Sequence, residues 1–169
     1  MPLSSRLSVE FGGKLTNTVD LGAAEANLTK RYALTLAAGV LAGQADRIWA
    51  DTRTVVPATP DDLDLAGSLL DALGGPATFA RIKGLVIAAA PGNTNNVVVG
   101  AAAANPWVGL LGATHTLTLR PGAVVALMAG TADLTAYPVV AGTGDTLRIA
   151  NSGAGTNVVY DVAVVGCAA

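Results

Sequence analysis

Residues 145–166 most constrain what this chain can fold into, because apolar side chains alternate there at a period of two. In residues 146–150, Leu147 and Ile149 share one face, and Thr146 and Arg148 the other. This periodicity is that of a β-strand, and the Asn, Ser and Gly of residues 151–155 tolerate the positive φ angles of a turn. The sequence therefore predicts two strands folded on each other as a β-hairpin. The second strand repeats the alternation with Val158, Tyr160, Val162 and Val164 on one face.

The same pattern of short alternating strands separated by Gly/Pro/Asn turns continues through most of the chain. Eight to ten strands are expected, with turns every 8–12 residues. Residues 63–74 mix two periods, and we expect a short strand followed by a turn of helix or an irregular loop. The pattern predicts an all-β fold, a single domain resembling a β-sandwich or jelly roll. The other expected strands lie at residues 31–36, 45–56, 78–90, 97–100, 114–120, 123–129 and 137–141.

The first thirty residues differ from the rest. Residues 7–11 and 14–21 alternate briefly, and residues 23–30 contain helix formers in a run too short for a stable helix. We therefore expect an extended N-terminal arm over residues 1–30, followed by the sandwich domain over residues 31–169. The exposed edges of such an arm can pair with the main sheet or with a neighbouring subunit.

Composition narrows the function classes. Hydrophobic residues make up 51% of the chain and charged residues 13%, so we expect a surface poor in charge that a partner completes. No apolar run approaches the roughly 20 residues of a membrane-spanning helix, and a net charge of −2 without a basic patch argues against nucleic-acid binding. The N-terminus lacks the apolar core of a secretion signal, and the lone Cys167 is expected to be a spectator thiol. We expect a protein made in a cytoplasm.

No catalytic motif stands out, and we expect neither an enzyme nor a cofactor. The chain has no nucleophile elbow, phosphate-binding loop or dinucleotide fingerprint. The only histidine, His115, lies within an expected strand, where a packed or surface role is favoured. The acidic run at residues 61–64 starts like a calcium loop, but Ala66 and Leu73 occupy ligand positions and the match fails. A loose cation site and a solvated loop remain as alternatives.

Several strings of residues, taken together, resemble a family of small structural proteins of tailed bacteriophages and prophages. The resemblance covers about residues 30–166 and implies a β-sandwich virion component that decorates or cements the capsid, often as a trimer. It implies the major capsid protein as partner, the capsid surface as location, and no catalytic residues. The strings are Gly43-Gln44-Ala45-Asp46, Asp51-Thr52-Arg53-Thr54, Asp62-Leu63-Asp64-Leu65-Ala66-Gly67-Ser68-Leu69, Phe79-Ala80-Arg81-Ile82-Lys83, Arg120-Pro121-Gly122, Gly144-Asp145-Thr146-Leu147-Arg148-Ile149-Ala150-Asn151-Ser152-Gly153, Tyr160-Asp161-Val162 and Val165-Gly166.

The expected functional residues are partner contacts in the arm and on the sandwich. The alternative function is a tail or head-fibre module that contacts the host surface, with loop aromatics such as Trp107 and Tyr137 binding glycans. Trp49 and Trp107 fit sugar stacking less well than core or interface packing. A third function, a cell-wall hydrolase, is disfavoured because no acid, nucleophile or metal set is assembled. The predicted contacts are Leu7, Val9, Phe11, Leu15, Ile48, Trp49, Arg53 and Trp107.

Overall fold

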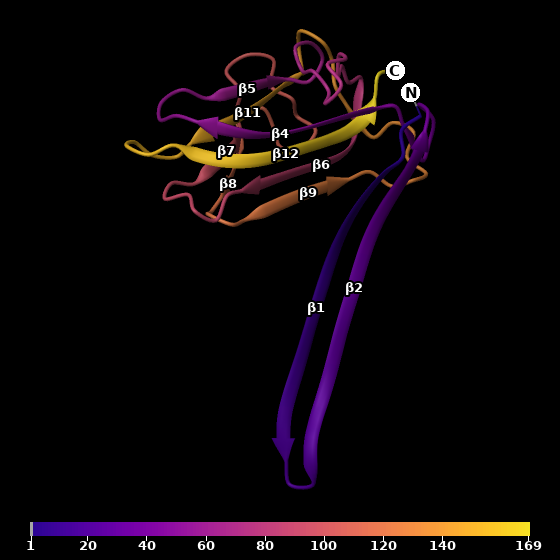
Figure 1. Ribbon diagram of the computed structural model, residues 1–169, viewed down its shortest axis with the longest axis vertical. Coiled ribbons are helices and arrows are strands. Elements are labelled where there is room, and N and C mark those ends of the chain that lie inside the picture. The colour runs from indigo at the N-terminus through magenta and orange to yellow at the C-terminus, as the bar shows by residue number, and fades with distance from the viewer. Residues whose placement is uncertain (1) are drawn as a thin grey trace.

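The computed structural model describes residues 2–169 and is all-β, with 55% of residues in strands and no helix in that range. The described residues form twelve strands, and consecutive strands often lie in different sheets (Figure 1). The strands are β1 (Ser5–Val19), β2 (Gly22–Ala38), β3 (Gln44–Ala45), β4 (Arg47–Val55), β5 (Asp61–Asp64), β6 (Arg81–Ala89), β7 (Val97–Gly100), β8 (Thr116–Leu119), β9 (Val124–Met128), β10 (Tyr137–Pro138), β11 (Thr146–Asn151) and β12 (Val158–Cys167).

Two antiparallel sheets face each other and form a β-sandwich. One sheet has the order β4-β12-β6, with β9 and β10 both pairing with the far side of β6. The other has the order β5-β11-β7-β8. The eight principal strands of the sandwich, in chain order, are β4, β5, β6, β7, β8, β9, β11 and β12. Counted in that order, strands 1, 8, 3 and 6 form one sheet, and strands 2, 7, 4 and 5 form the other. This is the connectivity of a jelly roll, so the expected fold class is confirmed.

The core lies between these two sheets and follows the alternation read from the sequence. Leu147 and Ile149 of β11 are buried, as expected for one face of a strand. Burying such side chains contributes about 1.5–3 kcal/mol each before the entropy of folding is subtracted. The sequence pattern therefore identified the inward face of both C-terminal strands. On β12 the buried residues are Val158, Tyr160, Val162 and Val164.

The prediction that β11 and β12 form a hairpin with each other is wrong. β11 pairs with β5 and β7, whereas β12 pairs with β4 and β6 in the opposite sheet. Residues 152–157 thus arch from one layer to the other. Alternation fixes which side chains face inward but not which strand is the neighbour, and crossing between layers lets both strands pair on two sides.

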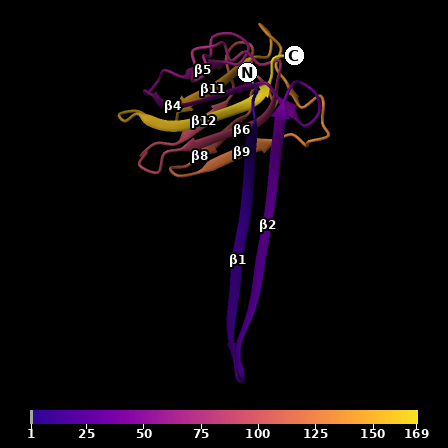
Figure 2. The ribbon, with the colours of Figure 1, turned by 45° about the vertical axis from the view of Figure 1, so that its right-hand side comes forward.

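A long hairpin of β1 and β2 projects from one end of the sandwich (Figures 1 and 2). Its register is unbroken from the pair Ser5–Leu36 to the pair Val19–Gly22. At about 3.4 Å per residue, its 15 paired positions span about 50 Å. The arm expected over residues 1–30 corresponds to most of this hairpin, but the expected boundary at residue 30 falls inside β2, and the strand expected at 31–36 belongs to the hairpin.

The remaining elements fall close to the expected ranges. In the segment 63–74, β5 ends at Asp64 and is followed by turns, so the irregular-loop form of that expectation is the one observed. Within residues 2–169, no helix is long and apolar enough to cross a membrane.

Candidate interaction surface

The projecting hairpin has one apolar and one polar face. Odd-numbered residues of β1 pair with even-numbered residues of β2, so both sets share a face. Phe11 is 60% exposed and Leu15 is 73% exposed on this apolar face, and Leu21 at the tip is fully exposed. The opposite face carries charged residues, including the Lys14–Glu25 ion pair at 2.6 Å. The apolar face is formed by Leu7, Val9, Phe11, Leu15 and Val19 of β1 with Leu34, Tyr32, Leu28, Ala26 and Ala24 of β2.

At its base, the same apolar face is buried against the sandwich. Leu34 and Leu36 are 3% and 1% exposed and form a second hydrophobic cluster with Ala45 and Val165. Leu7 packs on this cluster from β1. The apolar face of the hairpin therefore runs from a base that the five-stranded sheet already covers to a part, from Val9 to the tip, that is left in solvent.

Two basic side chains of β6 fix the loop between the hairpin and the sandwich. Arg81 donates to the carbonyl of Val40 at 2.6 Å, and Lys83 Nζ donates to the carbonyl of Leu41 at 2.5 Å. Lys83 is only 1% exposed and lies at the irregularity where the β6–β12 register shifts. An extra residue in one strand redirects a side chain, and here it turns Lys83 toward the loop that ends the hairpin.

The outer face of the five-stranded sheet continues this surface with small apolar side chains. A hollow of about 260 Å³ lies where the hairpin base meets the sheet, between residues 4–7 and Ile48, Val86 and Ala163. A second, of about 600 Å³, adjoins it over Ala50, Val86 and Ala163. Its polar rim is the pair Thr52–Asp161, in which the hydroxyl donates to the carboxylate at 2.6 Å. The surface beside the hairpin is thus shallow, weakly polar and open.

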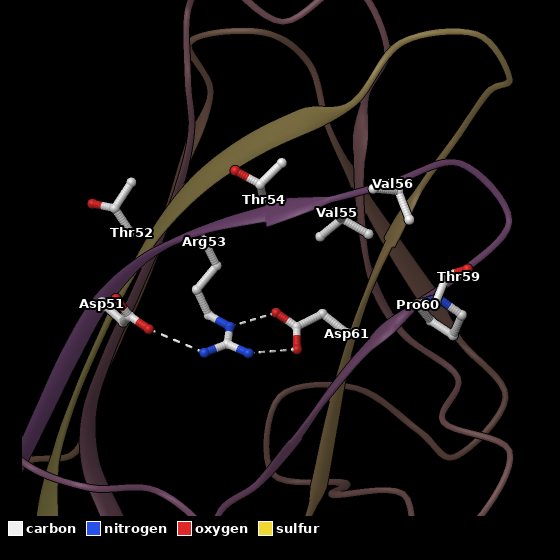
Figure 3. Close-up of a pocket in the computed structure, with 9 residues that line it drawn as sticks. All are labelled: Asp51, Thr52, Arg53, Thr54, Val55, Val56, Thr59, Pro60 and Asp61. Atoms are coloured by element: carbon white, nitrogen blue, oxygen red, sulfur yellow. Dashed lines mark hydrogen bonds and ion pairs between the residues drawn. The ribbon is translucent and has the colours of Figure 1, made fainter.

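At the opposite side of β4, Arg53 connects the two sheets of the sandwich. Its guanidinium donates to both carboxylate oxygens of Asp61 on β5, at 2.5 and 2.9 Å, and to Asp51 at 3.0 Å (Figure 3). These residues line an open hollow of about 350 Å³. A bidentate guanidinium–carboxylate pair is geometrically specific, so this contact fixes β4 against β5 where the sandwich edge is open.

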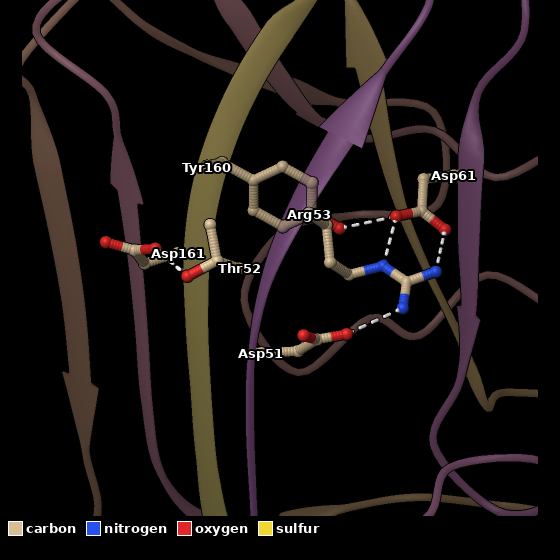
Figure 4. A network of polar contacts seen from close by, with 6 residues as sticks. All are labelled: Asp51, Thr52, Arg53, Asp61, Tyr160 and Asp161. Atoms are coloured by element: carbon tan, nitrogen blue, oxygen red, sulfur yellow. Dashed lines mark hydrogen bonds and ion pairs between the residues drawn. The ribbon is translucent and has the colours of Figure 1, made fainter.

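Tyr160 of β12 completes this network from inside the core (Figure 4). Its hydroxyl donates to Asp61 Oδ2 at 2.8 Å. Burial, together with the hydrogen bond to Asp61, raises the pKa of Tyr160 far above its usual range, so the phenol stays protonated and remains a donor. The hydrogen bond to Asp61 likewise raises the pKa of Arg53. With the carboxylate held by two fixed donors, the arrangement is suited to joining strands.

The acidic run that began like a calcium loop is divided between two faces of β5. Asp61 points inward to Arg53, whereas Asp62 points outward and accepts two hydrogen bonds of 2.7 Å from Arg148. Those bonds lower the pKa of Asp62. Asp64 accepts from the backbone N–H of Ala66 in the following turn. In residues 2–169, no group of three or more His, Cys, Asp and Glu side chains is placed to hold a metal ion.

The predicted partner contacts occupy three different environments. Val9, Phe11 and Leu15 lie exposed on the hairpin, with Leu7 partly buried at its base. Ile48 lies 46% exposed on the outer face of the five-stranded sheet. These five residues belong to the continuous surface described above.

The remaining three predicted contacts are engaged within the protein, two buried in the core and one ion-paired at the edge of the sandwich. Trp49 and Trp107 are each 5% exposed, and the Trp107 indole N–H donates to the carbonyl of Pro138 at 2.9 Å. Arg53 is held by Asp51 and Asp61. Core packing, the favoured alternative for the two tryptophans, is the environment observed.

The sequence interpretation missed the half of the surface that β2 contributes. Tyr32 is 58% exposed opposite Val9, and Leu28 is 58% exposed opposite Gly13. The available signal was the even-numbered spacing of Leu28, Tyr32 and Leu34, which continues on both sides of Lys30. No protein-family model, curated protein or solved structure matches this chain.

Proposed function

We propose that this protein is a structural virion component of a tailed bacteriophage, a capsid decoration or cement protein. It binds the major capsid protein on the head surface, stabilises the shell and acts as a homo-oligomer, with a trimer expected from the family resemblance. It is made in the cytoplasm of the bacterial host. The observation that carries the proposal is the hairpin of β1 and β2, whose exposed apolar face is suited to assembly.

The hairpin supports an assembly role because it is costly to leave uncovered. An isolated two-stranded ribbon is marginally stable in water, and exposed strand edges readily pair or aggregate. A chain that places Phe11, Leu15 and Leu21 on such a ribbon gains stability when another surface covers them. Proteins that function as free monomers rarely keep an apolar strip of this length exposed.

The sandwich supports a structural role by its connectivity and by the residues behind the resemblance. Jelly rolls occur in viral capsid domains and in lectins, and the fold alone does not choose between them. The polar residues in the shared strings largely bond to structural partners: Arg53 with Asp61, Asp62 with Arg148, and Tyr160 with Asp61. These polar residues are therefore accounted for by the framework of the sandwich.

The test is to add purified protein to phage heads that lack it and to locate it by immunogold labelling. We expect saturable labelling, spread evenly over the heads, and shells that resist heating better than bare ones. The matched control replaces residues 10–31 with Asn-Gly, a preferred two-residue turn. Val9 and Tyr32 would flank that turn at the same kind of paired position as Val19 and Gly22, ten residues away along each strand.

The outcomes separate the two function classes. Even labelling of heads that is lost with the shortened hairpin supports the proposal. Labelling confined to the tail would reject cement and favour the fibre or host-contact alternative. That alternative lacks one of its two suggested aromatic platforms, because Trp107 is buried. Absence of label on any part of the particle would reject both.

A further inference from the structure

The apolar face of the β1–β2 hairpin lacks a cover over most of its length. The buried cluster at the base shields Leu34 and Leu36, yet Phe11, Leu15 and Leu28 on the same face are more than half exposed. The covered part shows what this face is suited to, namely packing against another apolar sheet. In the purified protein, before any capsid is present, this uncovered part would be exposed to solvent.

The area of this face is close to what a stable interface needs. Eleven paired positions, from Val9–Tyr32 to Val19–Gly22, lie beyond the covered base and give a length of about 37 Å; two strands about 4.8 Å apart give a width of about 10 Å, hence about 370 Å² for each copy. Two such faces in contact bury about 750 Å² in total, about three quarters of the lower bound for a specific association. Any contact between adjoining sandwich surfaces adds to this.

The charges of the hairpin favour a second copy as the partner. They are nearly balanced, with four basic and three acidic residues in 5–38, and most lie on the polar face or at the turn. The exception is Lys30, opposite Phe11 on the apolar face. It lies on β2, an edge strand of the ribbon here, so its long side chain can reach water past the contact. Two identical faces can therefore meet without burying a charged group in the contact.

We propose that the apolar face of the β1–β2 hairpin is the interface between copies of this chain, with hairpins packed face to face at about 10 Å, the spacing of stacked sheets. A pair packed in this way is a dimer, in place of the trimer that the family resemblance implies. This inference rests on the proposed function, since it names the partner of the assembly arm. The polar faces of the paired hairpins and the sandwiches remain free to contact the capsid, and joining two copies strengthens the weak shell contacts that each one makes.

The test compares two lysine substitutions on adjacent residues of β1. Leu15→Lys places a charge on the apolar face, and Thr16→Lys places the same charge on the polar face, opposite Glu25. The mass of the full-length protein is measured by size-exclusion chromatography with light scattering over a wide concentration range. Near-ultraviolet circular dichroism of the buried Trp49 and Trp107 reports whether the sandwich stays folded.

We expect the unmodified protein and Thr16→Lys to have at least twice the 16.7 kDa chain mass, and Leu15→Lys to fall to one chain mass with an unchanged tryptophan spectrum. A 16.7 kDa unmodified protein at all concentrations would overturn the inference, as would equal behaviour of the two variants. The particle test is independent: a monomer that still labels heads keeps the proposed function, and an oligomer that never labels particles keeps only this inference.

Discussion

At the residue scale, the most informative side chains are two arginines that make similar bonds in different settings. Arg53 connects β4 to β5 across the two sheets, and its partner Asp61 is 16% exposed. Arg148 pairs with Asp62 directly across neighbouring strands of one sheet, where Asp62 is 41% exposed. Hydrogen bonds to charged groups contribute more when the partner cannot turn to water.

Replacing Arg53 with Met should therefore lower the free energy of unfolding by about 2 kcal/mol, because Asp61 would keep only the Tyr160 hydroxyl as a charge-stabilising partner. Replacing Arg148 with Met should lower it by less than about 1 kcal/mol. Urea denaturation of the two variants measures both values. Equal losses would show that the cross-sheet position has no special weight.

At the element scale, the hairpin depends on close contact with the sheet beneath it. Gly84 of β6 lies under that contact, and a Cβ atom there would stand 2.8 Å from Val165 Cγ1 and 3.3 Å from Leu7 Cδ2. Glycine thus lets the base of the hairpin approach the five-stranded sheet. From the sequence, Gly84 could be predicted only as part of a strongly apolar strand, because its close approach is to Leu7, 77 residues away.

Gly84→Ala should destabilise the protein by about 1–3 kcal/mol through overpacking against the branched Val165 side chain. Gly12→Ala, on the polar face of the hairpin, is the matched control, because a Cβ there meets no atom within 4 Å, and its effect should stay within about 0.5 kcal/mol. The midpoint of urea unfolding reports both changes. A Gly84→Ala protein as stable as the unmodified one would mean that the hairpin base does not press on the sheet as described.

At the scale of the whole molecule, stability should be distributed very unevenly. The sandwich has a core closed by two sheets, whereas β1 and β2 rely on each other beyond the base of the hairpin. Local opening follows buried contacts, so the hairpin should open independently of the sandwich unless it is covered.

Backbone amides of β6 and β12 should therefore be protected from hydrogen exchange in every form of the protein. Amides of residues 9–32 should be protected in the self-associated protein and exchange rapidly in Leu15→Lys. Peptide-resolved mass spectrometry measures this difference. Equal protection of residues 9–32 in both forms would contradict a hairpin stabilised by its partner.

The sequence by itself determined the local facts: which segments are strands, which of their faces are apolar, and where turns break them. It did so because backbone geometry sets a period of two and a buried face demands apolar side chains. The faces of β11 and β12, and the arm-like difference of the first thirty residues, were available in this way.

Only the tertiary structure decided which strands are neighbours. β12 pairs with β4 rather than β11, β2 extends through Ala38, and Arg53 reaches Asp61 rather than solvent. Many pairings satisfy the same alternation, and the choice among them depends on long-range packing of the whole core. For the same reason, the two tryptophans are buried in the sandwich, and the exposed apolar residues meet on one face of the hairpin.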